Sequence, residues 1–212
     1  MTETVDITPP GPTHGQRPRD ADPPAPGCVG GTLVQHAAAH LLAVSDHDLN
    51  ACAAALQEGI SNGSRIYTFG NGGSASTASH LASDLSHRQP GNGNPKARVH
   101  SLFDVTLTTA VGNDYGFDQI FVEPLRALLE GRDILVAVSV SGRSPNVLRA
   151  LELGRERGTT NIALLGTDGG DALALCDVWL RIPCDDFGVV ESVHLAAVHD
   201  LAVRAHSVSG SH

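Results

Sequence analysis

The chain is poor in aromatic and basic residues, and it has no long apolar run. Aromatic side chains make up 4% of its 212 residues, and 14 Lys and Arg stand against 23 Asp and Glu, for a formal net charge of -9. Because binding to nucleic-acid phosphates needs clustered basic side chains, this balance argues against a nucleic-acid partner. No stretch of about 18 apolar residues is present, so we expect no membrane span.

The cysteines form no recognisable framework. The four cysteines, Cys28, Cys52, Cys176 and Cys184, show no CxxC spacing, which favours neither a zinc ribbon nor a redox motif. The first 30 residues lack the apolar region of a signal peptide. Together these features predict a cytoplasmic protein with reduced thiols.

Proline is concentrated at one end of the chain. Residues 1–30 hold seven of the 12 prolines, mixed with Gly, Asp and Arg. Such a segment buries too little apolar surface to fold, so we predict a disordered tail over 1–30. Residues 31–212 have a suitable length for a single domain with one hydrophobic core.

Beyond the tail, the hydrophobic pattern predicts an α/β fold. Apolar residues recur at helical spacing from Thr32 to Ile60, which indicates two helices before the first strand. The expected strands are 65–70, 98–103, 133–140, 161–166 and 177–183, and the expected helices are about 74–87, 115–129, 145–157, 169–175 and 187–206. This alternation predicts a three-layer sandwich around a five-stranded parallel sheet, whose ligands bind at the carboxyl ends of the strands.

Two loops rich in serine and glycine follow predicted strands and precede predicted helices. They are Gly70-Asn71-Gly72-Gly73-Ser74 and Ser139-Val140-Ser141-Gly142-Arg143-Ser144. Glycine lets the backbone approach an anion, and the free N–H groups of a first helical turn point toward it. We therefore predict that both loops bind the phosphate group of a small molecule.

Two nucleotide-binding motifs fit these loops less well. No lysine follows either loop, so neither is the P-loop GxxxxGK[ST]. The first loop also fits GxGxxA, through Gly70, Gly72 and Ala75. A dinucleotide site would need an acidic residue about 20 positions further on. The second strand ends too late for that, near Asp104, so NAD is a poor second choice.

Histidines and carboxylates recur on two predicted helices. His80 and Asp84 are four residues apart and share one helical face. Glu191 and His199 are eight residues apart, a rotation of about 80° that lets both face one cleft. Imidazole and carboxylate together suit a divalent metal or proton transfer. The same spacing occurs in ordinary surface pairs, so spacing alone leaves both interpretations open.

Five segments, in order along residues 32–206, resemble the bacterial phosphoheptose isomerases, which have the sugar-isomerase (SIS) fold. They are GNGGSASTASHLASDL (70–85), AVGNDYGF (110–117), SVSGRSPN (139–146), LGTDGG (165–170) and VHLAAVH (193–199). The resemblance implies a flavodoxin-like strand order and the isomerisation of sedoheptulose 7-phosphate to a D-glycero-heptose 7-phosphate in heptose biosynthesis. It also implies a homotetramer with active sites at the subunit interfaces, to which the two N-terminal helices would contribute.

The resemblance further implies roles for individual residues. The substrate-binding positions are Asn71, Gly72, Gly73, Ser74, Arg88, Asn113, Asp114, Ser139, Val140, Ser141, Ser144 and Glu191, and Arg88 matches an arginine that can come from the neighbouring subunit. The positions for Zn²⁺ or another divalent metal are His80, Asp84, Glu191 and His199. Three of these, Asp84, Glu191 and His199, are also the candidate catalytic residues: Asp84 matches the acid/base position of the family, and the roles of Glu191 and His199 are our own hypothesis.

Two of these positions depart from the family pattern. Asp84 stands where the family typically has glutamate, and Glu191 stands where it typically has glutamine. Asp84 reaches less far by one methylene, so our hypothesis is that Glu191 and His199 handle the protons of a cis-enediol mechanism. Two alternatives remain: a non-catalytic SIS protein that binds a sugar phosphate or a protein partner, and an isomerase of another sugar phosphate.

Overall fold

A computed structural model describes residues 31–87 and 95–207 of the chain, so the predicted tail over 1–30 lies outside the described residues. The strands are β1 (Arg65–Gly70), β2 (Arg98–Ser101), β3 (Ile134–Ser139), β4 (Thr160–Leu165) and β5 (Val178–Arg181). They form one parallel sheet in the order β2-β1-β3-β4-β5. The predicted five-stranded parallel sheet is confirmed.

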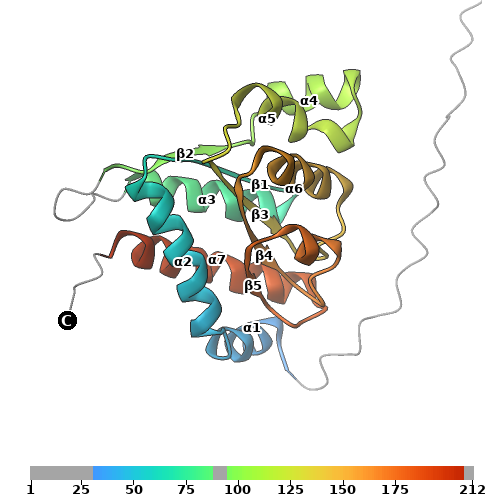
Figure 1. The fold of residues 1–212 in the computed structure, drawn as a ribbon. Helices are drawn as coiled ribbons and strands as arrows, with labels where there is room; N and C mark the ends of the chain where they lie inside the picture. Colours follow the sequence, from blue (N-terminus) through green and yellow to red (C-terminus); the bar gives the residue numbers. More distant parts are fainter. Residues whose placement is uncertain (1–30, 88–94, 208–212) are drawn as a thin grey trace, which may run out of the picture.

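Helices cover both faces of this sheet (Figure 1). The α-helices are α1 (Leu33–Leu42), α2 (Asp46–Ser61), α3 (Gly73–His87), α4 (Val105–Asp114), α5 (Val122–Leu128), α6 (Pro145–Arg157) and α7 (Phe187–His206), and the short 3-10 helices are η1 (Phe117–Gln119) and η2 (Asp171–Leu175). Helices α2, α3 and α7 cover one face, and α5 and α6 cover the other. The two predicted N-terminal helices are present as α1 and α2.

Side-chain alternation along β3 explains why both faces are covered. Ile134, Val136 and Val138 point into the core under α2, α3 and α7, whereas Leu135 and Ala137 point into the core under α5 and α6. Every residue of β3 is buried. A strand that is apolar on both sides is stable only between two helical layers, as in other parallel sheets. Among the described residues, no helix has both the length and the apolar character that crossing a membrane requires.

The segment after β2 differs from the prediction. We predicted a strand to 103 and one helix over 115–129, but β2 ends at Ser101 and α4, η1 and α5 follow as separate pieces. The β-branched residues of α4 lower its helix propensity, which explains why the sequence predicts no helix there. Gly116, with φ of 99°, ends the first helical segment before η1 begins. Helix α4 has a single buried residue, Val111, so its apolar residues carry little of the periodicity of a core helix.

One histidine of α7 lies in the core. His194 is fully buried, and its Nε2 lies 3.1 Å from the carbonyl oxygen of Leu165 at the end of β4. Within the described residues its Nδ1 has no hydrogen-bond partner. Burial lowers the pKa of His194 to about 4, because the protonated ring would lose its hydration there.

We expect acid to destabilise the protein through His194. The unfolded chain takes up a proton near pH 6.5, whereas the folded chain does so only near pH 4. The stability that neutral His194 contributes is therefore fully present above pH 6.5 and is lost as the pH falls toward 4, by about 3 kcal/mol for the full shift. Urea unfolding of the wild type and of His194→Gln between pH 7.5 and 4.5 measures the effect. The glutamine does not titrate, so equal pH slopes for the two proteins would contradict the expectation.

Candidate active site

The two serine- and glycine-rich loops meet at the carboxyl ends of adjacent strands. Gly70 at the end of β1 pairs with Val138 in β3. Between the loops lies a hollow of about 80 Å³, lined by Asn71, Ser74, Val138, Ser139, Val140, Ser141, Ser144, Phe187 and Glu191. Helices α3, α6 and α7 all begin beside it. The positive ends of three helix dipoles therefore surround one small space, which favours an anion.

The hydrogen bonds of the second loop leave its hydroxyl protons available. The Ser139 Oγ accepts a hydrogen bond of 3.1 Å from the Gly142 N–H, and the Ser141 Oγ accepts one of 3.2 Å from the Arg143 N–H. A hydroxyl that accepts in this way still has its own proton to donate. Ser144 precedes α6 without a side-chain capping bond, so its hydroxyl is also free of that role. The loop can thus present several donors to a phosphate group.

A reciprocal pair of amides joins the two loops. The Asn71 Nδ2 donates to the Asn146 Oδ1 at 2.9 Å, and the Asn146 Nδ2 donates to the Asn71 Oδ1 at 2.8 Å. Asn146 is buried and also accepts from the Val147 N–H at 2.9 Å. Asn146 is a residue of this site that the sequence patterns do not identify. Its position at the start of a helix beside the serine loop was the only available signal.

Glycine at the start of α3 makes room for a carboxylate from α7. A Cβ atom built on Gly73 would lie 2.4 Å from the Glu191 Oε2, so the carboxylate rests against the Gly73 backbone. The preceding residue, Gly72, has φ of 56°, a conformation that favours glycine. Glu191 therefore faces the hollow from α7 at the point where α3 begins.

Three of the four predicted metal ligands come together farther along α3 and α7. The ligand atoms of His80, Asp84 and His199 all lie within 4.8 Å of one another. The His199 Nδ1 is 2.9 Å from the Asp84 Oδ2, and the His80 Nε2 is 3.7 Å from the Asp84 Oδ1. These two separations bracket the distance of about 3.4 Å expected between two ligands of a tetrahedral zinc ion. The side chains are 42%, 22% and 54% exposed, respectively, which leaves a further coordination position open.

The structure does not bring Glu191 into this group. Its carboxylate lies at Gly73, at the other end of the shared helix pair. Glu191 and His199 share a helical face by rotation, but positions eight residues apart are also about 12 Å apart along the helix axis. The two helices run parallel: Gly73 faces Glu191, and Asp84 faces His199.

Two predicted substrate-binding residues lie elsewhere, and a third is outside the described residues. Asn113 and Asp114 are exposed at the end of α4, where the Asn113 Nδ2 donates to the Asp114 Oδ1 at 2.8 Å. Neither lines the hollow. Arg88 lies outside the described residues. Within the described part of the chain, neither the phosphate-type hollow nor the histidine group includes Asn113 or Asp114.

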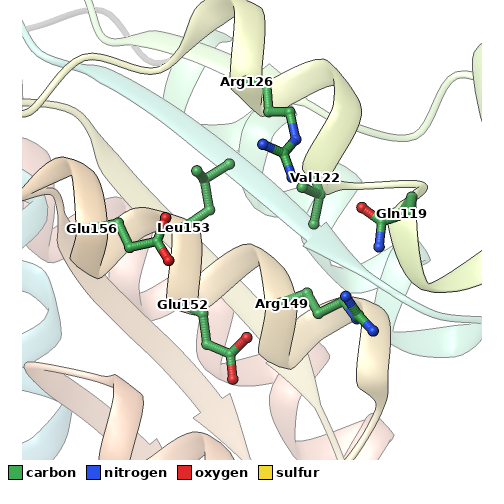
Figure 2. Close-up of a pocket in the computed structure, with 7 residues that line it drawn as sticks. All are labelled: Gln119, Val122, Arg126, Arg149, Glu152, Leu153 and Glu156. Carbon is green, nitrogen blue, oxygen red and sulfur yellow. The ribbon is translucent and has the colours of Figure 1, made fainter.

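A second hollow, of about 160 Å³, lies between α5 and α6 on the opposite face of the sheet (Figure 2). Its two arginines form ion pairs with carboxylates that lie outside its lining. Arg149 Nε is 2.9 Å from the Asp118 Oδ2, and Arg126 Nε is 3.1 Å from the Glu123 Oε1. It lacks both histidine and serine among its lining residues, so it offers neither of the chemistries found on the α3–α7 side.

The fold and the loops define the class of protein. The sequence model of the SIS domain family matches residues 34–166, which is more than half of the chain. The chain is therefore an SIS-domain protein.

Comparison with individual proteins narrows the class. The phosphoheptose isomerase of Pelobacter propionicus is 40% identical over 156 residues, covering 72% of this chain and 82% of that protein. The structure of the phosphoheptose isomerase from Neisseria gonorrhoeae aligns with a TM-score of 0.74 at 32% identity, covering 83% of this chain and 94% of the other. The enzyme from Francisella tularensis gives the same TM-score and identity over 82% and 92%. The chain belongs to the phosphoheptose isomerase family.

Proposed function

We propose that the protein converts sedoheptulose 7-phosphate to a D-glycero-heptose 7-phosphate through a cis-enediol. Membership of the family makes the chain a sugar-phosphate isomerase of heptose biosynthesis. The observation that carries the specific proposal is the placement of two sites on one helix pair. Gly73, beside the hollow, and His80, in the histidine group, are seven residues apart on α3. This is about 10 Å along the axis, which suits a substrate with phosphate at one end and the reacting carbonyl at the other.

In this proposal the hollow binds the phosphate. Asn71, Val140 and the four serines Ser74, Ser139, Ser141 and Ser144 line it, and Gly72 and Gly73 join Asn71 to Ser74 beside it. A dianion there is stabilised by hydrogen-bond donors and by three helix N-termini, without a basic side chain in the lining. Glu191 lies at the same hollow, where its carboxylate can accept hydrogen bonds from sugar hydroxyls.

The reacting end of the sugar lies at His80, Asp84 and His199. These residues would hold a divalent cation, for which Zn²⁺ fits the two imidazoles and one carboxylate. When bound, such an ion stabilises negative charge that develops on neighbouring oxygens. Asp84 and His199 are within hydrogen-bond distance of each other, which lets one orient the other while a proton moves between C1 and C2. Asp84 or His199, rather than Glu191, is then closest to the transferred proton.

A homotetramer would complete the site. Helix α4 exposes the apolar side chains of Val105, at 64%, and Leu107, at 44%, and Leu42 at the end of α1 is 90% exposed. Exposed apolar groups gathered on one element are typical of protein interfaces. Asn113 and Asp114 end this same helix. If a second copy covered α4, these two residues would lie at the interface, where they could contact the substrate of either copy. Arg88 would be supplied in the same way.

The deciding experiment is incubation of the purified protein with sedoheptulose 7-phosphate, with the product followed by NMR. We expect a new aldose signal, a loss of at least tenfold in rate after chelator treatment, and recovery on addition of Zn²⁺. Fructose 6-phosphate serves as the matched control for other sugar phosphates. Absence of any aldose product with Zn²⁺ present would overturn the proposal and favour a non-catalytic binding protein.

A further inference from the structure

The serine loop rests on the loop that follows β4. The Ala172 N–H donates to the Gly142 carbonyl oxygen at 3.0 Å, and a Cβ atom on Gly142 would lie 2.0 Å from the Gly169 carbonyl oxygen. The two loops therefore touch through their backbones. A shift in the 166–170 loop moves the Ser141–Gly142 turn, and with it the floor of the phosphate hollow.

A pair of charged side chains fastens this contact. The Arg143 guanidinium donates to both carboxylate oxygens of Asp168, at 2.9 and 2.6 Å, and its Nη1 also donates to the Ser141 carbonyl oxygen at 3.1 Å. The same Asp168 accepts from the Gly170 N–H at 3.0 Å. The Arg143 side chain thus binds its own loop and the neighbouring loop at once, in the two-pronged geometry that makes arginine–carboxylate pairs directional.

The partner loop is itself held in an uncommon conformation. Thr167 has φ of 43°, and it is the single residue other than glycine with positive φ in the described part of the chain. Its carbonyl oxygen accepts from the Arg181 Nη1 at 2.9 Å, and its N–H donates to the Cys184 carbonyl oxygen at 3.1 Å. Arg143 lowers the pKa of Asp168, so this carboxylate stays charged over the whole range in which the protein would work.

We propose that Arg143 is a positioning residue for phosphate binding, held by Asp168 so that it braces the Ser141–Gly142 turn and does not itself bind the phosphate. This rests on the proposed phosphate site. The arrangement explains why Arg143 does not line the hollow although it belongs to the serine loop. The guanidinium is committed to a carboxylate, and the neutral donors of the loop face the hollow.

The competing interpretation makes an opposite prediction for Asp168. If Arg143 were a phosphate ligand restrained by Asp168, then Asp168→Ala would release it and phosphate would bind more tightly. If Arg143 is a brace, Asp168→Ala and Arg143→Ala both weaken binding. Arg143→Lys keeps the charge and loses the two-pronged contact, so it separates geometry from electrostatics.

The test measures inorganic phosphate binding by calorimetry for the wild type and the three variants. Arg149→Ala is the matched control, because Arg149 is a similarly exposed arginine on α6 that pairs with Asp118 at the other hollow. We expect each of the three variants to bind phosphate about three- to fivefold more weakly, and Arg149→Ala to bind as the wild type does. In turnover assays, KM should rise by the same factor while kcat stays within about twofold.

Each other result is decisive. Tighter binding by Asp168→Ala, or unchanged binding by Arg143→Lys, would overturn the bracing role while leaving the phosphate site intact. The control Arg149→Ala could also lose phosphate affinity and unfolding midpoint to the same extent as the other three variants. In that case the Arg143–Asp168 pair would contribute only to general stability. Failure of the wild type to bind phosphate would instead remove the site on which both proposals depend.

Discussion

Replacing Asp84 with asparagine is expected to reduce kcat/KM for the isomerisation by about a thousandfold. Asp84 contacts both histidines, at 2.9 Å to His199 and 3.7 Å to His80, so one substitution removes a negative ligand and an orienting hydrogen-bond acceptor together. Loss of a positioned acid–base group typically lowers rates by about 10²–10⁴-fold. Asparagine preserves the shape of the side chain, so the folded state should persist. Steady-state kinetics and zinc content after dialysis provide two independent measurements.

Two variants serve as controls for this result. Asp84→Glu keeps the carboxylate and should retain zinc and most of the activity. Glu191→Gln changes a carboxylate at the other end of the helix pair, so we expect a loss of less than tenfold and tighter phosphate binding, because a negative charge leaves the hollow. A loss for Glu191→Gln as large as that for Asp84→Asn would make Glu191 the base, which is the hypothesis drawn from the sequence.

Substitution of Gly142 by alanine is expected to damage both stability and phosphate binding. Gly142 has φ of 61°, and its new Cβ would lie 2.0 Å from the backbone oxygen of Gly169. Neither loop can relieve this contact without breaking the hydrogen bond from Ala172 to Gly142. We expect the free energy of unfolding to fall by about 3 kcal/mol or more. Phosphate affinity should fall at least tenfold, as measured by urea unfolding and calorimetry.

Gly158→Ala isolates the contribution of backbone strain. Gly158 has φ of 75°, but a Cβ atom there would meet nothing within 4 Å. Its substitution should therefore lower stability by about 1 kcal/mol, the effect of the left-handed conformation alone, and leave phosphate binding unchanged. Equal losses for the two variants would show that the contact between the loops contributes nothing.

The features that the sequence predicts correctly are set either by neighbours along the chain or by a general rule of parallel sheets. The strand Arg65–Gly70 matches its expected bounds because an apolar run is followed at once by a glycine-rich loop. The pairing of the two serine loops follows from the rule that parallel strands end at one edge. His80 and Asp84 share a face because they are one helical turn apart.

The features that the sequence does not predict depend on contacts between distant segments. Asn146 pairs with Asn71 across 75 positions, and Arg143 meets Asp168 across 25. No local pattern identifies such partners. The separation of Glu191 from His199 was missed for a different reason, since a helical wheel records rotation and omits translation. Helix α4 was missed because an exposed helix lacks the apolar periodicity that a core imposes.

Under the proposed function, the parallel course of α3 and α7 would limit which sugar phosphates the protein accepts. The phosphate hollow lies at the start of α3 and α7, and the histidine group lies farther along the same two helices. The distance between the two sites is therefore fixed and would not adjust to the length of the substrate. A phosphorylated ketose with a shorter carbon chain, anchored in the same way, would present its carbonyl short of His80. Sugars of different length would then be distinguished by the distance between the two sites along the helices. No further side chain would be needed to exclude shorter sugars.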